Sequence, residues 1–287
     1  MATETVNNGL FRPELWSKLL NKLAFDDGVM LDCVNTKYQG EIKNQGDKVH
    51  IQTAGKVTVG TYVEGTDIDY QTLSGDTQEL EVDQSKYWAF KVADIAKVQA
   101  NVDFMTEYMQ NAKMELVNTK DAFLLGKSAD VPAANQLGDI ALTKDNVYSN
   151  LVKLRTTLRK NNAISASNKD RTGKSPWLVV DPDTFGIMLN APEAIHPTNF
   201  GDQAVRKGTL LHIAGFDVKE STVLKPVANK VTILAGVTEA ITFAEQITKT
   251  ESLRAEGSFN DLVRGLYLYG AKTVNPTYLA SLVNDIS

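Results

Sequence analysis

Hydrophobic residues recur at helical spacing over one long stretch in the first half of the chain. From Ile95 to Phe123 they follow steps of three and four residues, with the polar Thr119 at one step. Asp94 is a suitable N-cap and Gly126 a suitable C′ residue. The pattern therefore predicts one helix over residues 94–125, about 48 Å long at roughly 1.5 Å per residue. A parallel coiled coil is the alternative, although Thr119 would weaken its seam.

The chain ahead of this helix has the patterns of an arm and a hairpin. Over residues 1–35, clustered apolar residues and Pro13 predict an extended arm followed by a short amphipathic helix. Over residues 40–83, alternating runs at 49–51 and 57–59, separated by glycines, predict hairpin strands. An isolated hairpin of two short strands is only marginally stable, so we expect the hairpin to lie on another surface, which could belong to another subunit. The apolar arm must also dock, on its own domain or on a neighbouring copy.

The second half of the chain mixes helix and strand patterns. A strand over residues 86–92 leads into the long helix. Apolar residues from Val147 to Leu158 predict a second helix, capped by Thr143 and ending near Asn161. Residues 177–180 form a continuous apolar run typical of a buried strand, which Asp181-Pro182 ends by opening a short helix. Further strands are predicted over 210–213, 215–218, 231–234, 240–243 and 259–274. This order favours an α+β fold over a doubly wound sheet.

Two polar segments interrupt this half of the chain. Residues 192–207 form one loop, and residues 159–174, rich in serine and asparagine, are predicted to form a mobile loop. The second loop carries five basic residues: Arg159, Lys160, Lys169, Arg171 and Lys174.

Composition narrows the class of protein. The 287 residues are 43% hydrophobic, which suggests about two folding units of ordinary globular type. The single cysteine, Cys33, excludes an internal disulfide and a cysteine-based zinc site. The chain shows neither a secretory signal nor a long apolar run, so we expect a soluble protein made in the cytoplasm, without a membrane partner. The net charge of −5 argues weakly against a dedicated nucleic-acid binder.

No pattern in the chain supports catalysis. Residues 172–175 (TGKS) match the end of a phosphate-binding loop, but Asn168 stands where the earlier glycine belongs and Pro176 follows where a helix should begin. Cys33 is expected to be a small buried hydrophobe. The histidines lack sequence partners for a triad or a metal site: they are His50, His196 and His212. We therefore predict no catalytic residue, no cofactor and no metal, and a protein that is not an enzyme.

The order of these elements resembles the major capsid protein of tailed double-stranded DNA bacteriophages, the Hong Kong ninety-seven fold, over nearly the whole chain. The stretches that carry the resemblance are EVDQSKYWAFKVADI, WLVVDPDTF, GTLLHIAGFDVKES, AITFAEQI and GLYLYGAKTVNP. The resemblance implies an N-terminal arm over residues 1–35 and an extended hairpin, the E-loop, over 36–84. It implies a peripheral (P) domain with the spine helix over 85–138, an axial (A) domain over 139–226 and a return to the P domain over 227–287.

The resemblance also implies a function. A subunit of this kind assembles into the pentamers and hexamers of an icosahedral phage head that encloses double-stranded DNA, so we expect it in the host cytoplasm during assembly and then in the virion. The E-loop would lie over the neighbouring P domain, and the candidates for contacts between subunits are Val57, Val59, Tyr62, Trp16 and Phe11. Either the loop over residues 192–207 or the basic loop would lie near the local symmetry axis, and the basic loop could instead face packaged DNA without reading its sequence. Expected partners are further copies of the chain, a separate scaffolding protein, a portal and decoration proteins.

Two alternatives stay open at this point. An encapsulin-like cellular compartment shares the architecture but encloses cargo enzymes, and a groove for cargo tails would distinguish it. A cytosolic enzyme with an anion site around Lys174 would instead form a defined small oligomer and bind a phosphate ligand saturably.

Overall fold

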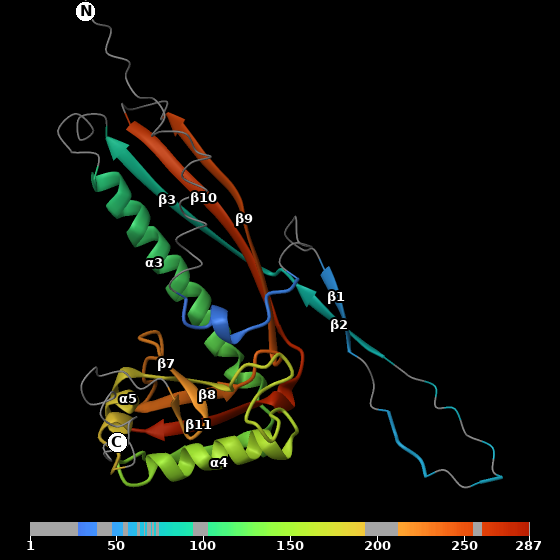
Figure 1. Cartoon of the computed structure of the whole chain (residues 1–287). Coiled ribbons are helices and arrows are strands. Elements are labelled where there is room, and N and C mark those ends of the chain that lie inside the picture. The colour runs from blue at the N-terminus through green and yellow to red at the C-terminus, as the bar shows by residue number, and fades with distance from the viewer. Residues whose placement is uncertain are drawn as a thin grey trace, which may run out of the picture.

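The computed structural model describes residues 28–38, 48–53, 57–61, 64–65, 67, 70, 72, 75–93, 103–192, 212–254 and 260–286. A six-stranded sheet lies at one end of the molecule, and a three-stranded sheet with a long helix beside it extends away from that end (Figure 1). A two-stranded hairpin projects to one side (Figure 1). The α+β class predicted from the sequence is confirmed.

The six-stranded sheet has apolar layers on both of its faces. Its strands are β4 (Gln136–Ile140), β5 (Trp177–Val180), β6 (His212–Ile213), β7 (Phe216–Glu220), β8 (Lys230–Gly236) and β11 (Leu279–Asp285). They lie in the order β4-β11-β8-β5-β7-β6. Helices α4 (Val147–Lys160) and α5 (Pro182–Leu189) supply buried side chains to one apolar cluster. In β5, Leu178 and Val180 belong to this cluster, whereas Trp177 and Val179 belong to a second one. The uninterrupted apolar run of β5 is therefore explained by a strand buried on both faces.

The three-stranded sheet and the long helix form the second layer structure. The strands are β3 (Gln84–Ala93), β10 (Asn260–Thr273) and β9 (Ile241–Arg254), antiparallel and in the order β3-β10-β9. Helix α3 (Asp103–Leu125) lies along one face of the sheet (Figure 1). Leu116 and Leu124 of the helix share an apolar cluster with Phe243, Val263 and Tyr269 of the sheet.

The predicted long helix is confirmed from Asp103 to its end at Leu125, and residues 94–102 lie outside the described residues. Gly126 is not the expected left-handed C′ residue: the backbone tightens there into a 3-10 helix, Gly126–Asp130. The position of the second cap was also predicted wrongly. Asn146, not Thr143, is the N-cap residue of α4, because residues 143–146 form a turn in which Asn146 Oδ1 accepts a hydrogen bond of 2.8 Å from the Thr143 amide.

The hairpin pairs strands that the sequence pattern did not connect. β1 (Lys48–Thr53) pairs with β2 (Asp76–Glu81), with Lys48 opposite Glu81. The prediction of a strand over 57–59 was wrong: the described residues there are exposed and in no strand. β2 is the better partner because Leu80 joins Val49 and Ile51 in an apolar cluster on the three-stranded sheet. The hairpin root therefore has a small core of its own, which the sequence analysis did not expect.

The last quarter of the chain is divided between the two sheets. Within residues 227–287, β9 and β10 belong to the three-stranded sheet, whereas β8 and β11 lie in the six-stranded sheet next to β5 and β4. Hydrogen bonding of β8 to both β5 and β11 makes it a central strand, which agrees with the burial of Val231, Ile233, Leu234 and Ala235.

The basic loop after α4 is held to the rest of the fold by buried side chains and hydrogen bonds. Ala163 and Ile164 are buried, and the Asp170 carboxylate accepts hydrogen bonds from the backbone amides of Thr172 (2.8 Å) and Lys174 (2.9 Å). Hydrogen bonds to Asp170 therefore hold the end of the loop in a fixed conformation.

Asn168, in the middle of the loop, joins it to two neighbouring elements. It accepts a hydrogen bond of 2.8 Å from Arg155 Nε of α4 and donates one to the Gly215 carbonyl. Gly215 stands in the left-handed region, with a φ of +85°, in the tight turn between β6 and β7. These bonds correct the prediction of a mobile segment.

Candidate assembly surfaces and the polar cluster of the spine helix

The projecting hairpin exposes large hydrophobic side chains beyond its paired strands. Val57 and Val59 are exposed, Val59 to 91%, as a role in contacts between subunits requires. Tyr70, exposed to 92%, is a further candidate that the sequence analysis missed because it lies in a polar stretch. The contacts of these residues stay a prediction. Three candidates from the sequence lie outside the described residues: Tyr62, Trp16 and Phe11.

The face of the three-stranded sheet turned away from α3 carries a row of exposed apolar residues. On β10, Val263, Tyr267 and Tyr269 are buried in the cluster with α3, so the alternate positions Leu262 and Leu266 point to the opposite face. Directly paired residues share a face of a sheet, which places Tyr87 beside Leu266 and Leu253 beside Leu262.

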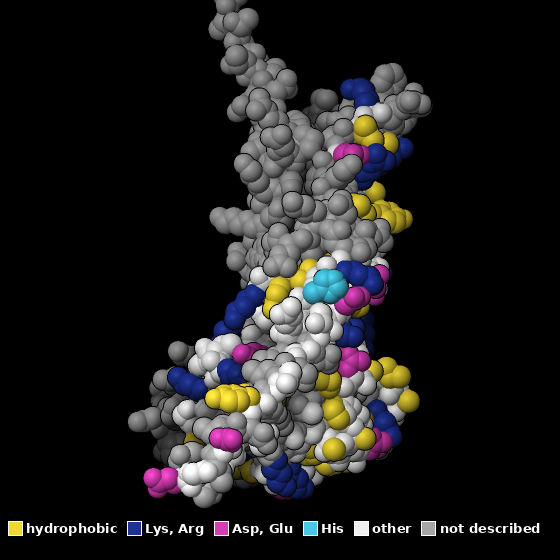
Figure 2. All heavy atoms as spheres, turned by 90° about the vertical axis from the view of Figure 1, so that its right-hand side faces the viewer, with side chains coloured by type: hydrophobic (Ala, Val, Ile, Leu, Met, Phe, Trp, Pro, Cys, Tyr) yellow, Lys and Arg dark blue, Asp and Glu magenta, His cyan; other side chains and the backbone are white. Residues whose placement is uncertain are grey.

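One ion pair lies within this row. Arg264 donates a hydrogen bond of 2.9 Å from Nε to Glu251, and it stands between Leu262 and Leu266 on β10. Figure 2 shows hydrophobic side chains among basic and acidic ones along the upper part of this side of the molecule. We call the set the open sheet face: Tyr87, Glu251, Leu253, Leu262, Arg264 and Leu266.

The same face is covered at its other end. Leu268, two positions beyond Leu266 on β10, is buried with Val49, Ile51 and Leu80 of the hairpin root. Tyr87, by contrast, is 81% exposed. The alternation of tyrosine and leucine in this strand is visible in the sequence, but which of the two faces is buried depends on where α3 lies.

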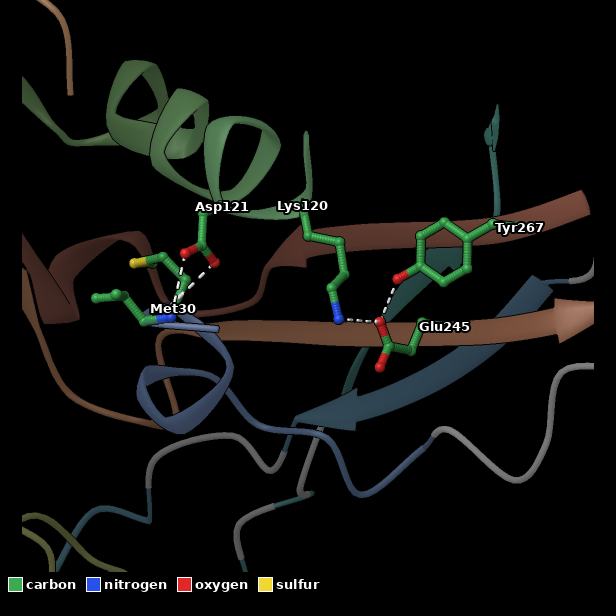
Figure 3. Close-up of polar contacts among 6 residues, drawn as sticks. Met30, Lys120, Asp121, Glu245 and Tyr267 are labelled. Carbon is green, nitrogen blue, oxygen red and sulfur yellow. Dashed lines mark hydrogen bonds and ion pairs between the residues drawn. The ribbon is translucent and has the colours of Figure 1, made fainter. Parts of the chain in front are cut away.

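A buried charged pair joins the long helix to the sheet (Figure 3). Lys120 Nζ of α3 lies 3.0 Å from Glu245 Oε2 of β9, and the two side chains are only 3% and 5% exposed. The Tyr267 hydroxyl of β10 donates a hydrogen bond to the same carboxylate oxygen. Burial and the neighbouring Glu245 carboxylate raise the pKa of Tyr267 well above its usual value. One carboxylate therefore holds the helix to two strands of the sheet, which the sequence pattern does not reveal.

The next residue of the helix holds the last part of the predicted N-terminal arm (Figure 3). The Asp121 carboxylate accepts hydrogen bonds from the backbone amides of Val29 (3.1 Å) and Met30 (3.2 Å). Burial raises the pKa of Asp121, and the two amide donors lower it in part. Asn35 then exchanges backbone hydrogen bonds of 2.9 Å with Ile241 and Phe243 at the start of β9. The segment is thus anchored to both the helix and the sheet.

Cys33 is fully enclosed between these anchors, as the sequence analysis expected. Its burial raises the pKa of the thiol to about 12. We expect native protein at pH 8 to react with a thiol reagent such as dithionitrobenzoate no faster than it unfolds, and one thiol per chain to react at once in denaturant. A Val59→Cys variant, with a cysteine at an exposed site, is the control that should react immediately. Rapid labelling of the native parent would show that residues 29–33 leave their site readily.

The structure does not bring together the described polar residues that the sequence analysis singled out. All five bases of the loop 159–174 are exposed, and Arg159 donates a hydrogen bond to the Ile164 carbonyl. The amides of Thr172 and Lys174, which a bound phosphate would use, already donate to Asp170. His212 is exposed and paired with Asp217, His50 is exposed beside Glu79, and His196 is outside the described residues.

No group of three or more potential metal ligands occurs among the described residues. None of the described helices combines the length and apolar character needed to cross a membrane.

Comparison in sequence finds no relative: no protein-family model and no curated protein matches the chain. Comparison with solved structures finds many. A chain from Mycobacterium phage Che8 is 23% identical, with a TM-score of 0.67 over 89% of this chain and 91% of that one. The capsid structure of the cyanophage P-SCSP1u is 15% identical and has a TM-score of 0.67, covering 89% and 86%.

Cellular shells are also similar, but to a lesser degree. An encapsulin complex from Synechococcus elongatus is 11% identical, with a TM-score of 0.56 over 90% of this chain and 88% of that one. Since phage capsid chains match nine-tenths of the residues with higher scores, the chain has the fold of the major capsid proteins of tailed bacteriophages.

Proposed function

We propose that the chain is the major capsid subunit of a tailed bacteriophage and assembles into the pentamers and hexamers of an icosahedral head. The observation that carries this proposal is that one subunit exposes apolar side chains in two places, on the hairpin beyond its paired strands and on the open sheet face. Within one subunit, the exposed residues of the hairpin do not cover the open sheet face. Repeated around a symmetry axis, the hairpin of each copy would cover the open sheet face of the next.

This arrangement assigns roles to the parts of the chain. The hairpin is the E-loop, the three-stranded sheet with α3 is the core of the P domain, and the six-stranded sheet with α4 and α5 is the A domain. The hairpin contributes Val57, Val59 and Tyr70 to the apolar contact. The open sheet face of the next copy contributes Tyr87, Leu262 and Leu266. Each contact is modest, but a closed shell repeats it in every subunit, so small contact energies are sufficient for a stable head.

The remaining partners follow from the proposed role and are part of the proposal. A head of this kind encloses double-stranded DNA and is built with a scaffolding protein and a portal, and decoration proteins can join it afterwards. The exposed bases of the loop 159–174 lie in the A domain and would be solvated near the local symmetry axis. The protein is then a component of the virion, assembled in the host cytoplasm, with a structural and non-enzymatic role.

Negative-stain electron microscopy of the purified chain, alone and with a candidate scaffolding protein, tests this function. We expect closed angular shells or tubes in at least one condition. Uniform small oligomers in both conditions would contradict the proposal and favour the enzyme alternative. Shells that form in the cell and enclose a defined cargo protein rather than DNA would favour an encapsulin-like compartment, against which the lower TM-score of 0.56 is the present argument.

A further inference from the structure

The hairpin root crosses the three-stranded sheet at a single glycine. β2 ends at Glu81, and the chain passes over β10 at Gly270 before β3 begins at Gln84. A Cβ atom at Gly270 would lie 2.3 Å from the Glu81 carbonyl oxygen and 3.0 Å from Val82 Cα. Both are backbone atoms, so no side-chain rotation could relieve the overlap.

Gly270 is required there for space and not for its backbone conformation. Its φ is not among the positive values of the chain, and it pairs regularly with Ala244 in the sheet. Ordinary contacts of a Cβ atom begin at 3.4 Å, so any side chain would force the two backbones about 1 Å apart. An alanine would therefore be tolerated by β10 itself but not by the strand that crosses it.

Contacts on either side of the crossing hold the root in one orientation. Val49, Ile51, Leu80 and Val82 of the hairpin form an apolar cluster that includes Leu268 of β10. A further hydrogen bond of 3.1 Å runs from the Gln78 side chain to the carbonyl of Val274, at the end of the sheet. The backbone contact at Gly270 lies between these two attachments, so a displacement at this contact would tilt the hairpin relative to the sheet.

We infer that Gly270 is a positioning residue for assembly: it sets the direction in which the hairpin leaves the subunit, and so determines where the hairpin meets the next copy. This inference rests on the proposed function. The paired strands are six residues long at about 3.4 Å per residue, and β2 has its end at the crossing, so a small displacement at Gly270 is amplified at the far end of the hairpin. The curvature of the shell would then be built into the soluble subunit.

The test compares Gly270→Ala with the parent and with Gly126→Ala, a matched control in which the new Cβ meets nothing within 4 Å. One spin label is placed at Gln52→Cys on β1 and the other at Val227→Cys, just before β8 of the six-stranded sheet, and both sites are exposed. The distance between the two labels reports the direction of the hairpin. Buried Cys33 stays unlabelled. We expect Gly270→Ala to keep a cooperative thermal transition, to shift the label distance in the soluble subunit, and to lose closed shells. Gly126→Ala should match the parent in all three.

An unchanged label distance in Gly270→Ala would overturn the inference, and so would normal shells formed at a shifted distance. If Gly270→Ala does not fold, Leu268→Ala tests the inference instead. This substitution removes apolar contacts between β10 and the hairpin root without introducing a steric clash. That variant should broaden the distance distribution and give shells of mixed size, and an unchanged distribution with uniform shells would overturn the inference. A parent that forms no shells would contradict the proposed function, while the distances still test the role of Gly270.

Discussion

Replacing Glu245 with leucine should lower the free energy of unfolding by about 3–5 kcal/mol, because the substitution removes the buried carboxylate that lies 3.0 Å from the buried Lys120 ammonium. The Tyr267 hydroxyl loses its acceptor in the same step. Urea-induced unfolding followed by tryptophan fluorescence measures the effect, since Trp88 lies in the same apolar cluster as Tyr267. Lys120→Met alone should cost a similar amount, because it leaves the carboxylate buried without its cation.

The double variant separates the charge pair from general packing. Lys120→Met combined with Glu245→Leu removes both charges and fills the space with apolar atoms, so its stability should return to within about 1 kcal/mol of the parent or exceed it. Lys144→Met, at an exposed lysine, is the control that should change nothing. Additive losses in the double variant would show that the pair acts only through the volume of its side chains. The pair would then have no part in holding α3 to β9 and β10.

Replacing Tyr87 with glutamate should prevent shell formation without changing the thermal unfolding of the subunit. Tyr87 is 81% exposed in the subunit, so its replacement removes no core contact. In the proposed assembly it is buried under the hairpin of the next copy, and a tyrosine that is a hot spot of such a contact contributes about 2 kcal/mol or more. A loss of that size raises the protein concentration needed for assembly by more than about tenfold.

Light scattering during assembly and electron microscopy of the product measure this effect. Val59→Asp, on the hairpin side of the same contact, should give the same loss. Val227→Glu is the matched control, since it places a charge at an equally exposed apolar residue that lies outside the open sheet face. Normal shells from Tyr87→Glu would show that the open sheet face is not the surface on which the hairpin lies.

The buried pair and the open sheet face affect different stages. Lys120 and Glu245 hold the helix to the sheet inside one subunit, whereas Tyr87 is exposed in the subunit and meets the next copy only in the proposed assembly. Variants in the first set should reduce the amount of folded protein. Variants in the second should leave folded protein that does not assemble.

Local features of the chain were predictable from the sequence because they depend on neighbours a few residues apart. The end of α3 at Leu125, the buried strand β5 and the helix that begins after Asp181 follow from helical spacing, a continuous apolar run and an aspartate followed by proline. Asp181 does cap α5, accepting a hydrogen bond of 3.1 Å from the Thr184 amide. The order of these elements was sufficient to indicate the fold.

Only the tertiary structure decided which distant segments meet. The partner of β1 lies more than twenty residues away in a strand of alternating polar residues, and local pattern favoured the nearer valines at 57 and 59. Lys120 and Glu245 are separated by 125 positions, and neither is marked by its neighbours as buried. The exposure of Tyr87 likewise depends on which face of the sheet α3 covers. A single sequence contains the spacing of residues along one element, but the pairing of strands and the burial of charges arise from packing between elements, and that packing defines the surfaces proposed for assembly.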